Sequence, residues 1–296
     1  MAATLTLMHN GLTSGVPGVP NHEAKRGGIA GWSAGAARRN LSFLYSIDGD
    51  ALALDGSVGY AFTLTVLDCP ETPQQWANAV NRFLLSMRRT YGCIRFHWVI
   101  EWQKRQVPHL HGCLYFNPAR IPKPIRVLDV WCETAECGAR PLAQTVTPIF
   151  GLRGWLQYVA KHAARGVKHY QRAGTSIPEA WRGRTGRMWG HRGNWPLAPA
   201  RKVYLAGREG DGAFFAFRRL ARSWRIADAR RAGDARRIAA ARRMLKCGDR
   251  KRSEVRGVSE WIDHAQAVII LANLLARGYS IGLPGEPPAV VSPGEG

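Results

Sequence analysis

Two histidines, His109 and His111, are separated by a single residue in the segment HLHGCLYF (109–116). Because side chains two positions apart in a β-strand point to the same face, the two imidazoles are expected to project side by side. In the preceding segment IRFHWVIEW (94–102), successive side chains are expected on opposite faces of a strand, so Glu101 lies on the face opposite the large apolar side chains. Pairing of the two segments as an antiparallel hairpin would bring this carboxylate to the histidines.

A carboxylate and two imidazoles make a metal site with three protein ligands and open coordination positions. This mixture of oxygen and nitrogen donors suits Mn²⁺ or Mg²⁺, and the ligand types also suit zinc. A metal ion there would act mainly as a Lewis acid on a phosphate ester. An H-x-H pair alone is more often a hydrogen-bonded surface pair, so the prediction depends on Glu101.

A second pair of reactive side chains, Tyr158 and Lys161, lies three residues apart in RGWLQYVAKHAAR (153–165). This segment is predicted to be a helix, which puts both side chains on one face. A tyrosine has an ordinary pKa of about 10 and becomes a nucleophile only when a nearby cation or metal stabilises its phenolate. Lys161 would supply that cation or bind a phosphate.

Hydrophobic periodicity elsewhere predicts the elements that position these residues. An antiparallel sheet with helices on one face, an α+β fold, would bury the apolar sides of the strands and leave the opposite face free for chemistry. The predicted elements in chain order are strand 60–66, helix 73–92, strand 94–102, strand 109–116, helix 124–135, strand 144–149 and helix 153–165.

The motifs occur in the order seen in HUH endonucleases, and the chain resembles the replication initiators of this superfamily that use one catalytic tyrosine. FTLT (62–65) matches the first motif, HLH (109–111) the second and YVAK (158–161) the third, while Glu101 stands where some branches have a carboxylate metal ligand. The resemblance covers roughly residues 58–170 and implies a five-stranded sheet.

Two further segments, 161–172 and 186–196, are similar to the region after the tyrosine in initiators of filamentous bacteriophages and related plasmids. Tyr170 lies twelve residues from Tyr158, which excludes the one-turn spacing of paired nucleophiles. The resemblance therefore implies a single nucleophile.

What the resemblance implies is transesterification by Tyr158, assisted by Lys161 and a divalent metal, which leaves a free 3′-OH and a 5′-phosphotyrosine link that is later rejoined. The substrate would be single-stranded DNA or an origin DNA hairpin. The chain has no G-x-x-x-x-G-K-[ST] motif for ATP phosphates, so a host helicase and polymerase are expected as partners.

Charge supports a nucleic-acid partner. The chain carries 42 Lys+Arg against 21 Asp+Glu, a net charge of +21, and residues 201–256 alone hold eighteen basic against six acidic side chains. Such a surface binds phosphates without reading sequence, although one side of an amphipathic helix there would also pack. The expected DNA-binding residues are Arg187, Trp189, Arg192, Trp195, Arg218 and Arg219, with the two tryptophans stacking on bases.

Four regions are expected along the 296 residues. They are a flexible arm over 1–40, an HUH endonuclease domain over 41–200, a mainly helical basic region over 201–283 that binds DNA or packs, and a disordered tail over 284–296. Without a secretory signal or an apolar run long enough for a membrane, the expected location is the cytoplasm of a bacterial host, where the six cysteines would be reduced.

Other functions fit parts of the pattern. Conjugative relaxases and some transposases use the same nicking chemistry. A histidine-triad nucleotide hydrolase would need a third histidine where Cys113 stands, and an RRM-like binding module would need exposed aromatic side chains on the sheet face that carries Thr63 and His111.

Overall fold

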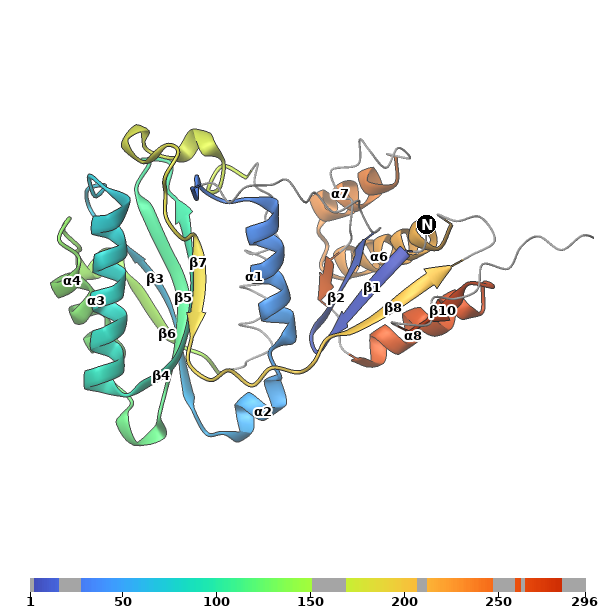
Figure 1. Ribbon diagram of the computed structural model, residues 1–296, viewed down its shortest axis with the longest axis horizontal. Coiled ribbons are helices and arrows are strands. Elements are labelled where there is room, and N and C mark those ends of the chain that lie inside the picture. The colour runs from blue at the N-terminus through green and yellow to red at the C-terminus, as the bar shows by residue number, and fades with distance from the viewer. Residues whose placement is uncertain are drawn as a thin grey trace, which may run out of the picture. The chain divides into compact units, whose positions relative to one another are not determined.

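The computed structural model describes residues 3–15, 28–150, 169–206, 212–246, 259–261 and 264–283. The chain divides into two compact units, Ala24–Leu197 and the combination of Met1–Glu23 with Ala198–Gly296. Each unit contains its own five-stranded antiparallel sheet (Figure 1). The expected α+β class with a five-stranded antiparallel sheet is confirmed.

The sheet of the first unit has the strand order β6-β3-β5-β4-β7. Its central strands are the predicted hairpin and the predicted first strand, and every neighbouring pair is antiparallel. The strands are β3 (Val58–Thr65), β4 (Cys93–Trp102), β5 (Pro108–Phe116), β6 (Thr145–Pro148) and β7 (Trp189–Arg192).

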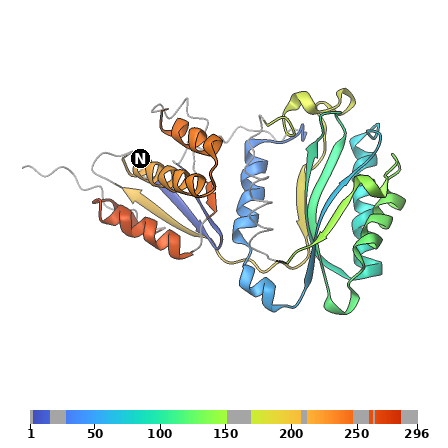
Figure 2. The same ribbon diagram turned by 180° about the vertical axis from the view of Figure 1, so that it is seen from behind.

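One face of this sheet packs against α3 (Pro73–Tyr91) and α4 (Pro124–Thr134), which lie side by side in Figures 1 and 2. Helix α3 begins with a capping box at Thr72 and ends at Gly92, whose φ of 65° satisfies the left-handed C-cap. Trp76 and Trp131 meet edge to face within the core beneath these helices.

The opposite face was expected to be free, and that expectation was wrong in part. Helix α1 (Ala34–Ser46) packs there, on the other side of the sheet from α3 (Figure 1). Its buried residues include Asn40 and Phe43, which contact His97 on β4. The apolar periodicity of this helix went unrecognised because it follows a glycine- and alanine-rich stretch.

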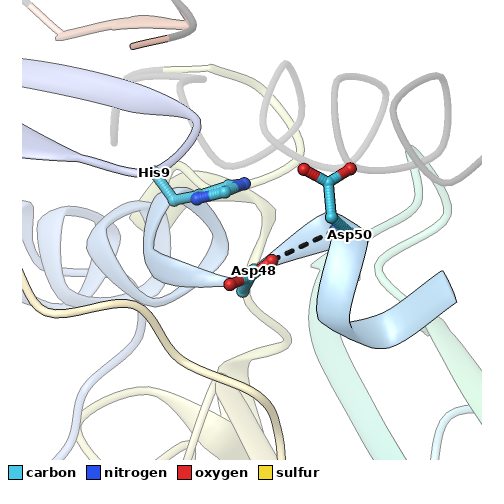
Figure 3. A group of neighbouring side chains, drawn as sticks. All are labelled: His9, Asp48 and Asp50. Carbon is cyan, nitrogen blue, oxygen red and sulfur yellow. Dashed lines mark hydrogen bonds between the residues drawn. The ribbon is translucent and has the colours of Figure 1, made fainter. Parts of the chain in front are cut away.

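Helix α1 is followed by the short helix α2 (Gly49–Leu54). The carboxylate of Asp48 accepts hydrogen bonds from the backbone N–H groups of Asp50 and Ala51, as Figure 3 shows for Asp50. Asp48 is thus the N-cap of α2. The described residues of this unit also form four short 3₁₀ helices, at Pro118–Arg120, Pro141–Ala143, Gly174–Ser176 and Glu179–Trp181.

The second unit pairs the two ends of the chain in a sheet of order β10-β8-β1-β2-β9. A flexible arm was expected at the N-terminus, but residues 3–15 form a hairpin in which Met8 pairs with Gly11. Leu5 and Leu12 of this hairpin are fully buried. The strands are β1 (Ala3–Met8), β2 (Gly11–Gly15), β8 (Arg201–Ala206), β9 (Ser259–Trp261) and β10 (Ser280–Gly282).

In the described part of this unit, three helices accompany the sheet: α6 (Gly212–Arg231), α7 (Ala235–Lys246) and α8 (His264–Leu275). Gly233, with a φ of 64°, lies between α6 and α7. Helix α6 contacts β1, β8 and α8. Helices make up most of the described part of residues 201–283, so its expected mainly helical character is confirmed, while strands β8, β9 and β10 of this region join the sheet.

Within the described residues, no helix is both long and apolar enough to cross a membrane. The cysteines in these ranges, from Cys69 to Cys137, carry free thiols. The predicted helix 153–165 and the expected tail 284–296 lie outside the described residues.

Candidate active site

The β4–β5 hairpin brings the three predicted metal ligands to one face of the sheet. In its register Glu101 lies directly opposite His109. On the other side of β5, strand β3 places Thr63 opposite His111. Because alternate residues of a strand share a face, Glu101, His109, His111 and Thr63 form one contiguous group.

Close strand approach in this group depends on Gly112, which follows the two histidines. A Cβ atom added there would lie 2.2 Å from the carbonyl oxygen of His97 and 2.5 Å from the ring of Phe62. Any larger residue would therefore force β5 away from β4. The glycine keeps the register that aligns Glu101 with His109.

His111 is oriented by a hydrogen bond to its neighbour. The Nδ1 atom of its ring lies 3.0 Å from Oγ1 of Thr63, and its Nε2 atom lies 3.9 Å from Oε2 of Glu101. The ring of His109 is close by, with its centroid 4.3 Å from that of His111. With Nδ1–H donating to the threonine hydroxyl, Nε2 carries the lone pair that a metal requires.

Glu101 is held by a cation that sequence reasoning missed. Arg172 directs two guanidinium nitrogens at the same oxygen, Oε1, with Nε at 3.1 Å and Nη2 at 2.9 Å. The side chains of both residues are 0% exposed. Buried charges in proteins need such a partner, so Arg172 accounts for the burial of a carboxylate in this sheet.

Two of these donor groups, Glu101 and His111, are spaced as ligands of one divalent metal ion would be. Two metal–ligand bonds of about 2.1 Å span at most about 4.2 Å. The 3.9 Å between Nε2 of His111 and Oε2 of Glu101 is within that span, and it is too long for a hydrogen bond. Mixed imidazole and carboxylate donors also match the ligand types expected for Mn²⁺ or Mg²⁺.

The predicted nucleophile Tyr158 and its neighbour Lys161 lie outside the described residues. Their assignment stays a prediction from the sequence.

The far end of the same sheet face is closed by packing. Nε2 of His97 donates a hydrogen bond of 2.7 Å to Oδ1 of Asn40, and Phe43 stacks on both His97 and His191. Burial, followed by the proximity of His191, lowers the pKa of His97 to about 3. His97 is therefore a neutral packing residue at physiological pH.

The expected DNA-binding residues of the first unit differ in exposure. Arg187 and Arg192 are exposed, and Arg192 lines a cleft of about 630 Å³ together with Arg88. Trp189 is half-buried in β7. Trp195 is only 6% exposed and donates its indole N–H to the carbonyl of Arg192, so its ring is not available to a base in this structure.

In the second unit, Arg219 is exposed on α6, whereas the side chain of Arg218 lies outside the described part of the structure. Asp234 caps α7 by accepting a hydrogen bond from the backbone of Arg237. Arg236 and Arg237 are exposed on the first turn of this helix. The α6–α7 hairpin therefore presents several guanidinium groups to solvent.

Comparison with known proteins gives the class of this chain, which is that of replication-associated proteins. The sequence model described as replication-associated protein ORF2/gene 2 protein matches residues 59–175, which include the hairpin and Tyr158. This match, together with relatives that are 42–46% identical over most of the chain, shows that the chain belongs to the replication-associated protein family.

Particular relatives come from bacteria and from a bacteriophage. A putative replication protein of Xylella fastidiosa (strain 9a5c) is 45% identical over 259 residues, covering 86% of this chain and 90% of the relative. Another from strain Temecula1 is 46% identical over 265 residues, covering 88% and 99%. The replication-associated protein of Pseudomonas phage Pf3 is 42% identical over 272 residues, covering 89% and 92%. No solved structure matches the chain.

The resemblance to phage and plasmid replication proteins is thus confirmed. The sequence alone did not indicate the roles of two residues beside the candidate site. Thr63 lay in the FTLT motif, but no role was assigned to its hydroxyl. Arg172 lies 71 positions from Glu101, and only the fold brings them together.

Proposed function

We propose that the protein initiates rolling-circle DNA replication by nicking one strand through Tyr158, beside a divalent metal bound by Glu101, His109 and His111. The observation that carries this proposal is the β4–β5 register, which sets a buried carboxylate opposite two histidines in a replication-associated chain. The pairing leaves Oε2 of Glu101 directed at Nε2 of His111.

The protein's own groups have defined tasks in this proposal. Thr63 fixes the ring of His111, and Arg172 neutralises Glu101 and occupies its other oxygen. When bound, Mn²⁺ or Mg²⁺ would polarise the scissile phosphate and stabilise the charge that develops on it.

The covalent step is a transesterification with a balanced exchange of bonds. The phenolic oxygen of Tyr158 forms a bond to phosphorus and loses its proton, while the bond from phosphorus to the 3′ oxygen breaks and that oxygen gains a proton. Lys161 would stabilise the phenolate or bind the phosphate. The products are a 5′-phosphotyrosine link and a free 3′-OH, and the reverse reaction rejoins the strand.

Exposed arginines support DNA as the substrate. Arg187 and Arg192 lie in the first unit, and Arg219, Arg236 and Arg237 lie on the α6–α7 hairpin of the second. Guanidinium groups bind phosphates in either single-stranded DNA or an origin hairpin. A host helicase and polymerase would extend the free 3′-OH.

A binding module without catalytic activity is less well supported. Such a module would present aromatic side chains on the open sheet face, whereas this face carries Thr63, His109 and His111 at one end and is covered by α1 at the other. Relaxases and HUH transposases share the proposed chemistry, but the relatives of this chain are named as replication proteins.

The metal requirement is tested with the full chain and single-stranded origin DNA from its own replicon. Cleavage is expected with Mn²⁺ or Mg²⁺ and is expected to stop when EDTA removes the ion. Restoration by added Mn²⁺ would show that the loss is reversible. Equal cleavage in EDTA would contradict the metal part of the proposal.

DNA binding by the α6–α7 hairpin is tested through its salt dependence. The double variant Arg236→Ala/Arg237→Ala should flatten the plot of log affinity against log salt concentration by about 0.7–0.9 for each phosphate that the variant no longer binds. Arg120→Ala, which removes an exposed arginine from the first unit, provides the control. An unchanged slope in the double variant would exclude these arginines from the DNA interface.

A further inference from the structure

We infer that Arg172 is a positioning residue that fixes Glu101 in its metal-binding orientation, with Trp32 holding the guanidinium from behind. The inference rests on the proposed function, because it assigns to Glu101 the role of a metal ligand. It adds two residues that neither the motifs nor the family description identify.

Two contacts between Arg172 and Glu101 involve the same carboxylate oxygen, Oε1. Nε of Arg172 donates a 3.1 Å hydrogen bond to Oε1, and Nη2 forms an ion pair with the same oxygen at 2.9 Å. The other oxygen, Oε2, is the one that lies 3.9 Å from Nε2 of His111. Arg172 thus holds Oε1 of the carboxylate, and Oε2 is directed at His111.

Rotation of the Glu101 carboxylate would undo this placement of its two oxygens. Turning Glu101 about its terminal bond would exchange the two oxygens or move both away from His111. The planar guanidinium resists this rotation through the directional hydrogen bond from Nε and the ion pair of Nη2 with the same oxygen. A lysine at position 172 would keep the positive charge but would supply a single ammonium group without that planar geometry.

Trp32 holds the guanidinium in place on a second side. The guanidinium carbon of Arg172 lies 4.1 Å from the centre of the Trp32 ring, a cation–π contact. The indole N–H of Trp32 donates a 2.7 Å hydrogen bond to the carbonyl of Ile100, the residue before Glu101. Trp32 thus binds both the arginine and the strand that carries its carboxylate partner.

The backbone around Arg172 is also attached to β4. The N–H of Trp102 donates to the carbonyl of Gln171 at 2.8 Å. The two neighbours of Glu101 in β4 are therefore attached to Arg172 and its surroundings. Ile100 binds Trp32, and Trp102 binds Gln171, the residue before Arg172. This arrangement restricts the arginine, and partners that orient a metal ligand raise affinity for the metal.

A purely structural ion pair is the alternative, and metal affinity separates the two roles. Arg172→Lys keeps the charge in the folded protein, and Trp32→Phe keeps an aromatic ring but loses the hydrogen bond to Ile100. Arg182→Lys makes the same substitution at an exposed position nearby in sequence and serves as the matched control. Each variant is compared with the wild-type full chain by urea unfolding and by Mn²⁺ titration monitored by electron paramagnetic resonance.

For Arg172→Lys the expected result is Mn²⁺ binding about tenfold weaker or more. Trp32→Phe should weaken it by about threefold, because phenylalanine is the poorer cation–π partner. Arg182→Lys should bind as the wild type does. If Arg172→Lys does not fold, Trp32→Phe decides the question.

The inference is overturned if every folded variant at positions 172 and 32 binds Mn²⁺ as the wild type does. A change in the free energy of unfolding alone would not support it. Failure of the proposed metal site is a different outcome, in which the wild-type protein and Glu101→Ala bind Mn²⁺ equally weakly.

Discussion

The two ends of one sheet face both carry buried polar side chains, but these side chains have different surroundings and different roles. On β4, His97 and Glu101 are four residues apart and point to the same side. His97 is hydrogen-bonded to Asn40 beneath α1, whereas Glu101 is bound to Arg172 and directed at His111. Both side chains are 0% exposed.

The difference lies in what surrounds each buried group. At His97 the surroundings are an amide and aromatic rings, and burial, with a smaller effect of His191, lowers its pKa to about 3. At Glu101 a buried guanidinium supplies the compensating charge. A histidine on this sheet is thus a candidate ligand only where a carboxylate shares its surroundings, and residue type alone does not distinguish the two ends.

Removing a histidine from each end gives the largest expected contrast. His111→Ala should reduce Mn²⁺-dependent cleavage of origin DNA by at least about 100-fold, because it deletes a ligand and even the partners of ligands contribute 10- to 100-fold. His97→Gln, which retains a side-chain N–H for Asn40, should cleave within about threefold of wild type. The measurement is the initial cleavage rate at saturating Mn²⁺.

Equal losses in these two variants would contradict the division of the face into a reactive end and a packing end. Thermal unfolding of both proteins provides the control, since His111→Ala should remain folded.

Acid should destabilise the packing end through His97. Its folded-state pKa of about 3 is below the ordinary value of 6.5, so protonation favours the unfolded chain. The contribution of neutral His97 is therefore complete above about pH 6.5 and is lost as pH falls toward 3, by about 1.4 kcal/mol for each pH unit. Urea unfolding between pH 7 and pH 4 should show this loss in the wild type.

The variant His97→Gln should lose less stability over the same pH range. His191, whose pKa is also lowered by burial and then by Arg187, remains in both proteins and forms a common background. Identical pH dependence in wild type and His97→Gln would show that His97 is not the titrating group.

The smallest expected effect concerns Asn40, the hydrogen-bond partner of His97. Asn40→Ala removes the acceptor 2.7 Å from Nε2 and leaves a buried donor unsatisfied. The expected cost is about 1–3 kcal/mol in the free energy of unfolding. Arg39→Ala, at an exposed position on the same helix, should change stability by no more than about 0.5 kcal/mol.

Cleavage by Asn40→Ala at a temperature where it is folded should match the wild type. A marked loss of cleavage there would extend the reactive end of the sheet to α1.

The parts of the fold that were predictable are those whose partners are close in sequence. The β4–β5 hairpin joins strands separated by five residues, and alternation of side chains was enough to place Glu101 opposite the histidines. Helix α3 carried explicit end signals in Thr72, Pro73 and Gly92. These signals act locally, so sequence pattern captures them.

The second unit was missed because its sheet joins residues about 200 positions apart, as in the pairing of Thr4 with Tyr204. The segment 4–7 does alternate threonine and leucine, and Asn10-Gly11 is a common turn sequence. Those cues were outweighed by the glycine- and proline-rich stretch that follows. A two-stranded hairpin is marginal alone, and only the distant strands β8 and β9 make it stable.

Replacing Tyr158 tests the proposed nicking reaction at its nucleophile. Wild type and Tyr158→Phe are incubated with Mn²⁺ and single-stranded DNA from the protein's own origin, and the products are separated on a denaturing gel. The account predicts a covalent protein–DNA adduct with the wild type and none with Tyr158→Phe. An adduct or metal-dependent cleavage that persists in Tyr158→Phe would contradict it and assign the nucleophile to another residue.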